Sequence, residues 1–198
     1  MHFFSAITVV LAATASCVSA VTIRNYRTGT CKGNYLQCSN VGALTCCDLQ
    51  AQKVYSSSLF LGLPTTAVGS ICRRNGQNSC GKVMKTGRGL SLCLGQGSAT
   101  GSFWFDCRSC KRSAKLQDRG LDLVAAQAQN SVEAALPSIV AFEDHQFKIN
   151  GDVPQNMTDA LLHLYHSDAS YADIPHEYLQ YEVKDVAGDL GEEEEKAA

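Results

Sequence analysis

The distribution of cysteine is the feature that most constrains how this chain can fold. It has ten cysteines in 198 residues, and none follows Cys110. Setting aside Cys17 in the N-terminal apolar stretch, nine remain, a density that in a secreted chain predicts a disulfide framework. Nine cysteines cannot all pair within one chain, so one is left as a free thiol or bonds a second copy, and the pairing stays open. Adjacent Cys46 and Cys47 are expected to bond different partners. The nine are Cys31, Cys38, Cys46, Cys47, Cys72, Cys80, Cys93, Cys107 and Cys110.

The first twenty residues have the pattern of a secretory signal peptide. An apolar run over Phe3 to Ala15 is followed by Val18-Ser19-Ala20. Small residues at these positions are what signal peptidase accepts, so we expect cleavage after Ala20 and a secreted, extracellular protein. No apolar run reaches the roughly 18 residues that a membrane span needs. We therefore do not expect an integral membrane protein.

Charge divides the rest of the chain into two regions. Residues 21–112 carry a net charge of +10, and residues 113–198 carry −12. The boundary holds the pair Lys111-Arg112, after which kexin- and furin-type proteases of the secretory pathway cut. We expect a basic cysteine-rich domain over 21–112 and an acidic, cysteine-free region over 113–198, with a disordered end at about 186–198. The junction is either a processing site or an uncut linker.

Short alternating runs predict that the basic region is mainly β. Val21 to Tyr26, Leu90 to Leu94 and Ser102 to Phe105 alternate or are rich in β-forming residues, and turn signals such as Asn75-Gly76 separate them. Short strands with frequent turns favour a disulfide-rich small sandwich or Greek-key domain.

The acidic region has a mixed pattern, and we expect it to be mixed α/β or partly disordered. Residues 115–135 are rich in Ala and Leu and favour a helix. The pair Asn150-Gly151 predicts a turn between two short extended pieces, and Thr158 is placed to cap a further helix. Asn156-Met157-Thr158 is a glycosylation sequon, which predicts an N-glycan at Asn156 on a surface loop.

Part of the basic region resembles a known fold. Tyr26, the six residues that follow it, Gly33 and the later run Tyr55-Ser56-Ser57-Ser58 resemble the aromatic–Gly–Ser signature of βγ-crystallin-like Greek-key domains. The resemblance implies that fold. It does not imply calcium binding, because Lys53-Val54-Tyr55 precedes the serines where the family's clamp needs an acid. The layout as a whole is similar to small secreted cysteine-rich fungal proteins, which implies an effector or killer-toxin-like role.

The basic region lacks the usual groups of an active site. It has no His and no Glu, and its only side-chain carboxylates are Asp48 and Asp106. A His general base is therefore excluded within it, as are Ser-His-Asp and Cys-His mechanisms. We predict no catalytic residue, no metal and no cofactor. The alternative is an enzyme that takes its His from the acidic region, at His163, His166 or His176.

The remaining chemistry is binding. The excess of positive charge predicts contact with an extracellular anionic surface, either a membrane or a wall polysaccharide, or with a host protein. A second expected contact is intramolecular, with the acidic region acting as a masking or pro-segment. Nucleic acid is not expected, because aromatic residues do not interleave with the cations. The alternative is a wall-associated structural protein that stays uncut. The predicted basic surface is Arg24, Arg27, Lys32, Arg73, Arg74, Lys82, Lys85 and Arg88.

Overall fold

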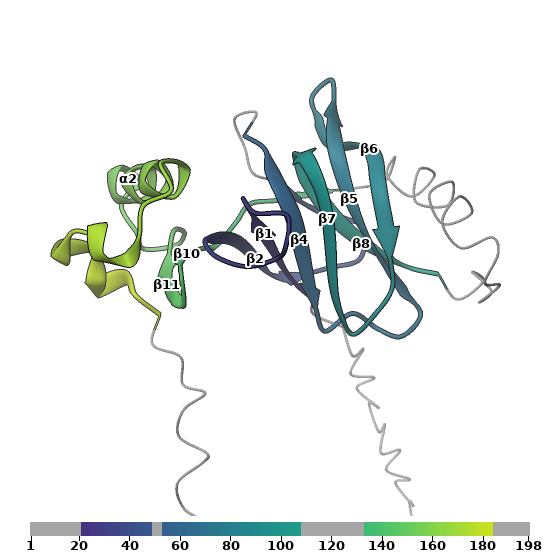
Figure 1. The fold of residues 1–198 in the computed structure, drawn as a ribbon, viewed down its shortest axis with the longest axis horizontal. Helices are drawn as coiled ribbons and strands as arrows, with labels where there is room; N and C mark the ends of the chain where they lie inside the picture. The colour runs from purple at the N-terminus through teal and green to yellow at the C-terminus, as the bar shows by residue number, and fades with distance from the viewer. Residues whose placement is uncertain (1–20, 49–52, 108–132, 184–198) are drawn as a thin grey trace, which may run out of the picture.

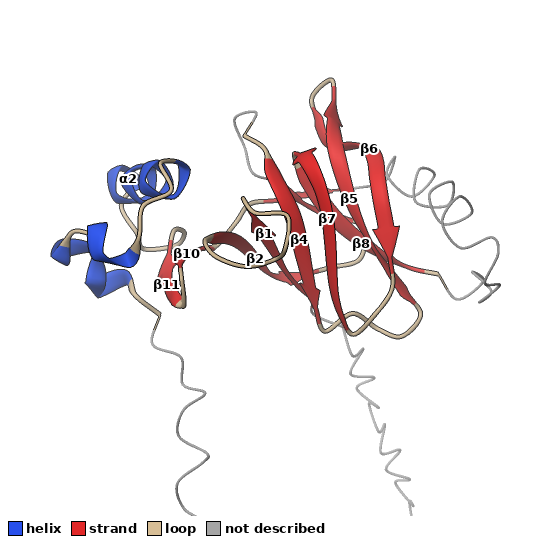
Figure 2. Ribbon diagram, in the orientation of Figure 1, coloured by secondary structure: helices blue, strands red, loops and turns tan. Residues whose placement is uncertain are grey.

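Two β-sheets packed face to face form the body of the protein (Figures 1 and 2). The computed structural model describes residues 21–48, 53–107 and 133–183. The predicted cleavage sites, Cys110 and the acidic end lie outside these ranges. The expectation of a mainly β, disulfide-rich domain is confirmed. The elements are β1 (Val21–Tyr26), β2 (Tyr35–Val41), β3 (Thr45–Asp48), β4 (Tyr55–Leu61), β5 (Ala67–Asn75), β6 (Asn78–Gly87), β7 (Ser91–Ala99), β8 (Gly101–Asp106), β9 (Glu133–Ala135), β10 (Ile139–Phe142), β11 (His145–Lys148), α2 (Gln155–His166) and the 3₁₀ helices η2 (Tyr171–Asp173) and η3 (His176–Tyr181).

The strand order shows two units of four strands that exchange one strand. Sheet A has the order β11-β10-β2-β1-β4-β7, and sheet B has the order β6-β5-β8-β3-β9. The unit β1–β4 places its third strand in sheet B, and the unit β5–β8 places its third strand in sheet A. Each sheet therefore contains strands of both units, which makes the two units a single folding body.

The core lies between the sheets and continues on one outer face. Ile23, Phe60 and Ile71 point inward from alternating positions of their strands and are fully buried. A second buried cluster, around Val68 and Phe103, lies on the other face of sheet B. Residues 67–72 of β5 and 101–105 of β8 are consequently buried on both sides, which explains why these stretches contain no charged residue.

Three disulfides cross-link the strands of the sandwich. Cys31–Cys93 joins the β1–β2 loop to β7, Cys38–Cys47 joins the two sheets, and Cys46–Cys80 joins β3 to β6. The expectation that Cys46 and Cys47 bond different partners is confirmed. Cys107 is also disulfide-bonded, and Cys72 is the free cysteine of the described residues. Cys72 is fully buried and burial raises the pKa of its thiol, so it is not placed to bond a second copy.

Residues of the acidic region complete both sheets. The hairpin β10–β11 adds to sheet A at the edge of β2, with Val140 opposite Leu36, and β9 lies parallel to β3 in sheet B. Helix α2 packs against β10, and its residues Leu161 and Tyr165 join the same core cluster as Ile23. The sandwich therefore draws its core from both sides of the predicted domain boundary.

The local structure of the acidic region differs from three expectations. The Asn150-Gly151 turn is present, with Gly151 at a φ of +71°, but helix α2 and not a strand follows it. The hairpin turn is at Glu143-Asp144, with Phe142 and Phe147 buried on either side of it. The last three residues of the predicted 115–135 helix form β9, and the rest lie outside the described ranges. Thr158 lies inside α2, where its hydroxyl donates to the Ile149 carbonyl instead of capping the helix.

Candidate functional site: a basic edge and a polar hollow

Three cations gather where the edges of the two sheets face one another. Arg73 and Lys82 are cross-strand partners on β5 and β6, and Lys85 lies further along β6. All three are exposed. The Nε of Arg73 donates to the Ser98 carbonyl at 3.3 Å, and the Nζ of Lys85 donates to the Gly95 carbonyl at 3.3 Å. The side chains of Arg73 and Lys85 thus lean toward β7. We call Arg73, Lys82 and Lys85 the basic edge.

A β-bulge brings these side chains to one side. Residues three apart on a regular strand, such as Lys82 and Lys85, point to opposite faces. Here Ile71 pairs with Lys85 and Cys72 with Val83, so one residue of β6 is extra at this point. The shift puts Lys85 opposite Ile71 and Lys82 opposite Arg73, which are two residues apart and share a face.

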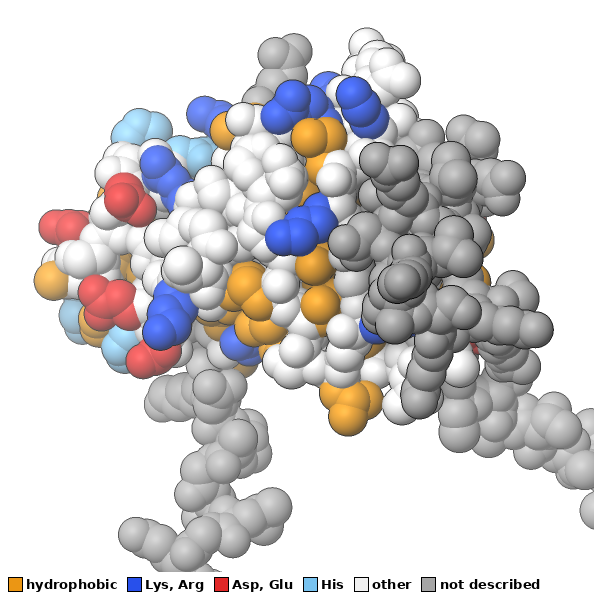
Figure 3. Space-filling view, turned by 45° about the vertical axis from the view of Figure 1, so that its right-hand side comes forward, with side chains coloured by type: hydrophobic (Ala, Val, Ile, Leu, Met, Phe, Trp, Pro, Cys, Tyr) orange, Lys and Arg blue, Asp and Glu red, His pale blue; other side chains and the backbone are white. Residues whose placement is uncertain are grey.

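The basic edge has no carboxylate beside it among the described residues. The ion pairs described are Arg74–Asp48 and His145–Glu182, and neither includes a residue of the basic edge. Figure 3 shows Lys and Arg side chains spread over the sandwich, whereas most Asp and Glu side chains of that face gather at the end formed by the C-terminal elements. Within the described residues, the positive charge of the edge is therefore not neutralised by a carboxylate.

The other predicted surface cations serve different purposes. Arg74 pairs with Asp48 at 3.5 Å. Arg88 is half-buried, with its Nε and one Nη lacking a hydrogen-bond partner. Lys32 is exposed in the β1–β2 loop, and Arg24 lies in the hollow described below. The basic surface expected from the sequence is thus divided among separate locations.

Arg27 holds the acidic region in place. Its guanidinium donates to the carbonyls of Tyr165, at 2.9 Å, and of His166, at the C-terminal end of α2. A cation at this end satisfies unpaired carbonyls and complements the helix dipole. Asn34 adds a second tie, since its amide donates to the Ala169 carbonyl and accepts from the Glu143 backbone N–H.

The two carboxylates of the basic region do not form a catalytic pair. Asp48 lies opposite Gly101 at the start of β8, and Asp106 is the last residue of that strand. A strand of this length separates them by roughly 17 Å at ~3.3 Å per residue, which is beyond the spacing of a glycosidase pair.

The histidines are also dispersed. His145 bonds Glu182 at 2.6 Å and stacks on Tyr171, while His163 and His176 are exposed. Burial, with Lys53, Arg27 and His163 nearby, lowers the pKa of His166 to about 4, so it is neutral at pH 7. Within the described ranges, no three His, Cys, Asp or Glu side chains gather as a metal site would require.

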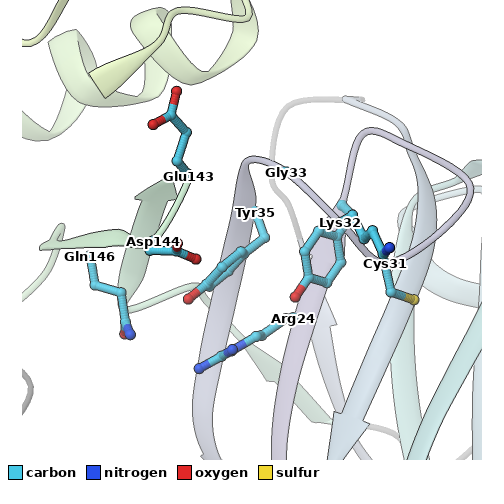
Figure 4. A pocket seen from close by; sticks show the side chains of 9 residues that line it. Arg24, Cys31, Lys32, Gly33, Tyr35, Glu143, Asp144 and Gln146 are labelled. Carbon is cyan, nitrogen blue, oxygen red and sulfur yellow. The ribbon is translucent and has the colours of Figure 1, made fainter. Parts of the chain in front are cut away.

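A polar hollow on the outer face of sheet A was not expected from the sequence. Its volume is about 670 Å³, and it lies between the β1–β2 loop and the β10–β11 turn (Figure 4). Sequence patterns do not reveal it, because its two walls come from regions more than a hundred residues apart. Its lining residues are Arg24, Tyr26, Cys31, Lys32, Gly33, Tyr35, Glu143, Asp144 and Gln146.

A buried polar cluster between the sheets was also missed. The Asn25 Oδ1 accepts from Ser58 at 2.7 Å and from Ser102 at 2.9 Å, and its Nδ2 donates to Cys47 Sγ at 3.3 Å. All of these groups are fully buried and paired, so the cluster fixes the relative position of the sheets. It offers no opening for a ligand.

Two further predictions concern the surface. Asn156 is exposed, but it is the second residue of α2 and not part of a loop. In the part of the chain that the structure describes, no helix has the length and apolar character of a membrane span.

Comparison with known proteins places the basic domain in a family. A family model described as ARB_05566_N, an N-terminal domain, matches residues 22–134. The match runs from the second residue of β1 to the second residue of β9 and covers more than half of the chain. The comparisons with curated proteins and with solved structures gave no match. The chain therefore belongs to the ARB_05566_N family.

Proposed function

We propose that this chain is an extracellular, non-enzymatic binding protein that attaches to an anionic surface through the basic edge. The observation that carries the proposal is the gathering of Arg73, Lys82 and Lys85 at one exposed edge, where none of the three pairs with a carboxylate of the described residues. Attraction to anionic lipid is worth ~1 kcal/mol per well-placed Lys or Arg. Three such residues give a useful affinity that falls as salt rises.

The extracellular location of the protein is part of the same proposal. Disulfides persist in oxidising compartments, and the described cysteines other than Cys72 are bonded. This is consistent with an extracellular protein. The proposal adds cleavage after Ala20, a glycan on exposed Asn156, and an effector or toxin-like role at a host surface, as the likeness to small secreted fungal proteins implies.

We extend the proposal to the fold class, as a βγ-crystallin-like Greek-key domain. Three features support it. Gly33 has a φ of +84°, as a glycine in a tightly folded hairpin would. The Ser57 hydroxyl accepts from the Cys31 N–H at 2.9 Å and donates to the Thr28 carbonyl at 2.6 Å, which pins the same hairpin. The second unit has a related tie, from Thr100 to the Ser79 carbonyl at 2.8 Å.

The position of the acidic region favours a structural role over a masking role. In sheet A the hairpin β10–β11 occupies one edge and β7 the other, and the basic edge lies beside β7 (Figure 1). The described acidic residues thus stand across the sheet from the cations that they would mask. We propose that residues 133–183 complete the sandwich and stay with it, whether or not the chain is cut after Arg112.

The test is binding of residues 21–198 to vesicles and to an acidic polysaccharide. The variant Arg73→Gln/Lys82→Gln/Lys85→Gln is compared with a matched control, Lys32→Gln/Lys53→Gln/Lys148→Gln, which removes three exposed cations elsewhere. At ~1 kcal/mol per cation, the triple variant should bind phosphatidylserine vesicles about 100-fold more weakly. The control should bind these vesicles nearly as well as the parent protein does. Neutral vesicles should bind neither the parent protein nor the variants.

Polygalacturonate beads, with cellulose as the neutral comparison, distinguish a wall polysaccharide from a lipid surface. A loss on the beads alone would identify the polysaccharide as the target. Equal retention of the triple variant and the control on both anionic supports would refute the proposal.

A further inference from the structure

We propose that the polar hollow on sheet A binds a short zwitterionic peptide, with Arg24 holding its carboxylate and Asp144 its ammonium group. This goes beyond attachment to an anionic surface, because it assigns a second site on a different face and a different class of ligand. The argument rests on the construction of the floor, the charges of the two walls and the space between them.

The floor of the hollow is built across four strands by register. Arg24 and Tyr26 are two residues apart on β1 and share the outer face of the sheet. Tyr35 lies opposite Tyr26, Ala141 opposite Tyr35, and Gln146 opposite Ala141. The row therefore runs from β1 through β2 and β10 to β11, so the floor exists only when the acidic region is docked on β2.

The first wall is positive and rigid. The Arg24 guanidinium lies 4.7 Å from the centre of the Tyr35 ring, and its Nε donates to Gln37 Oε1 at 2.8 Å. Lys32 comes from the β1–β2 loop, which is fixed by the Cys31–Cys93 disulfide and by Ser57. A wall held in this way is ordered before a ligand arrives, which lowers the entropy cost of binding.

The second wall is negative. Glu143 and Asp144 form the turn between β10 and β11, and the turn is held by the hydrogen bond from Glu143 N–H to Asn34. In Figure 4 the Asp144 carboxylate reaches toward Tyr35, whereas Glu143 points away toward the helix. Asp144 is therefore the acid that faces the hollow.

The cations of the first wall form no ion pair with the acid of the second wall. The ion pairs of the described residues include neither the cations Arg24 and Lys32 nor Asp144. A purely anionic or purely cationic ligand is attracted by one wall and repelled by the other. A zwitterion is attracted by both, so charge complementarity selects it. The hollow's volume of about 670 Å³ lies in the ~300–1,000 Å³ range of small-ligand sites.

The aromatic floor does not favour a neutral sugar. Tyr26 and Tyr35 are only 4% and 5% exposed, and their ring centres are 5.1 Å apart. Arg24 already covers one face of Tyr35. No open ring face remains for a sugar to stack on, so the polar rim and not the aromatic floor determines the ligand.

The first experiment is a titration of ¹⁵N-labelled residues 21–198 with four matched probes. Triglycine carries both charges, N-acetyl-triglycine lacks the ammonium, triglycinamide lacks the carboxylate, and N-acetyl-triglycinamide lacks both. We expect triglycine to shift the Gln146 side-chain amide signals. Each singly capped probe should bind about tenfold more weakly, since a charge-assisted hydrogen bond is worth roughly that factor.

Variants then assign the charges to residues. Asp144→Asn should weaken the binding of triglycine about tenfold and leave the binding of N-acetyl-triglycine unchanged. Arg24→Gln should also weaken the binding of triglycine about tenfold, but it should leave the binding of triglycinamide unchanged. Lys32→Gln removes an exposed cation of the β1–β2 loop that points away from Arg24, so it should weaken triglycine less than Arg24→Gln does. Asp152→Asn, in the turn that follows β11, is the control and should bind like the parent.

Some outcomes would overturn the assignment. Equal binding of all four probes would do so, as would the absence of triglycine binding at millimolar concentration. A third such outcome is that maltotriose or trigalacturonate, and not triglycine, shifts the same amide signals. The basic-edge triple variant should bind triglycine normally. A failure here therefore leaves the surface-attachment proposal standing, and a failure of that proposal leaves this one standing.

Discussion

Ser57 is a single hydroxyl on which the shape of the β1–β2 loop depends. It is fully buried and bonds two backbone groups of that loop, Cys31 N–H and Thr28 carbonyl. Ser57→Ala leaves both without this partner, so we expect the free energy of unfolding to fall by about 1–3 kcal/mol. Ser56→Ala, at the neighbouring half-buried position, is the control. Urea unfolding measures both, and equal stability of the two variants would contradict the expected role.

We expect His166 to make the stability of the protein sensitive to acid. The pKa of His166 is lowered to about 4, from an ordinary value near 6.5, by burial and by Lys53, Arg27 and His163. Between these values the unfolded chain binds a proton that the folded chain does not. The contribution of neutral His166 is thus complete above pH 6.5 and is lost as pH falls toward 4.

We expect His166→Gln to flatten this part of the pH–stability profile, because it keeps a polar side chain at the end of α2 without titrating. Melting temperatures between pH 7 and pH 4 measure it. His176→Gln, at an exposed position in η3, should leave the slope as in the parent. Parallel profiles for His166→Gln and the parent would show that other groups determine the acid sensitivity.

Strand β8 passes directly beneath a disulfide, and one glycine allows it to do so. A Cβ at Gly101 would lie 2.7 Å from the Sγ atoms of both Cys46 and Cys80. Gly101→Ala therefore forces the strand and the disulfide apart, and overpacking of this kind costs ~1–3 kcal/mol. Gly97→Ala in β7 is the matched control, since nothing lies within 4 Å of its Cβ. Thermal unfolding of the two should differ by several degrees, and equal melting temperatures would contradict the crowding.

The elements found from sequence are those with a local signal. Alternation marked β1, and clustered aromatic residues marked β8. The hairpin β10–β11 had no such signal, because its turn is Glu143-Asp144 and carries neither Gly nor Pro, and the nearby Asn150-Gly151 was the stronger turn pattern. The exchange of third strands between the two units depends on pairings between distant residues, which local patterns do not encode.

The candidate sites show the same division. Composition identified which residues are cationic, but not which of them are free. Arg27 is occupied because α2 ends beside it, and Lys82 and Lys85 share a face because of a bulge opposite Ile71 and Cys72. To predict the polar hollow, one would have to know that residues near position 144 lie beside β2. Each of these facts is tertiary, so charge counting alone could not supply it.

A shared apolar core joins the described parts of the two charge regions. Phe142, Phe147 and Leu161 of the acidic region share a buried cluster with Ile23 and Leu36. Residues 21–198 cut after Arg112 with a kexin-type protease should therefore keep both fragments together. We expect them to co-elute in size-exclusion chromatography at 1 M NaCl, where charge attraction is screened within about 3 Å.

Urea at 6 M, which weakens apolar contacts, should separate the same fragments and serves as the positive control. Co-elution at low salt with separation at 1 M NaCl would instead mean that opposite charge, and not a shared core, joins the two regions.

The order in which the chain is made gives the placement of β10 a further consequence. The three described disulfides use cysteines no later than Cys93, whereas the strand that covers β2 begins at Ile139. A chain emerging from the ribosome therefore contains every partner of those bonds while β2 is still an open edge with unpaired backbone groups. If these bonds form as soon as their partners have emerged, we expect a cross-linked intermediate in which one sheet edge is still unpaired. Chaperone capture or self-association is expected there, and it ends when residue 142 has emerged and paired.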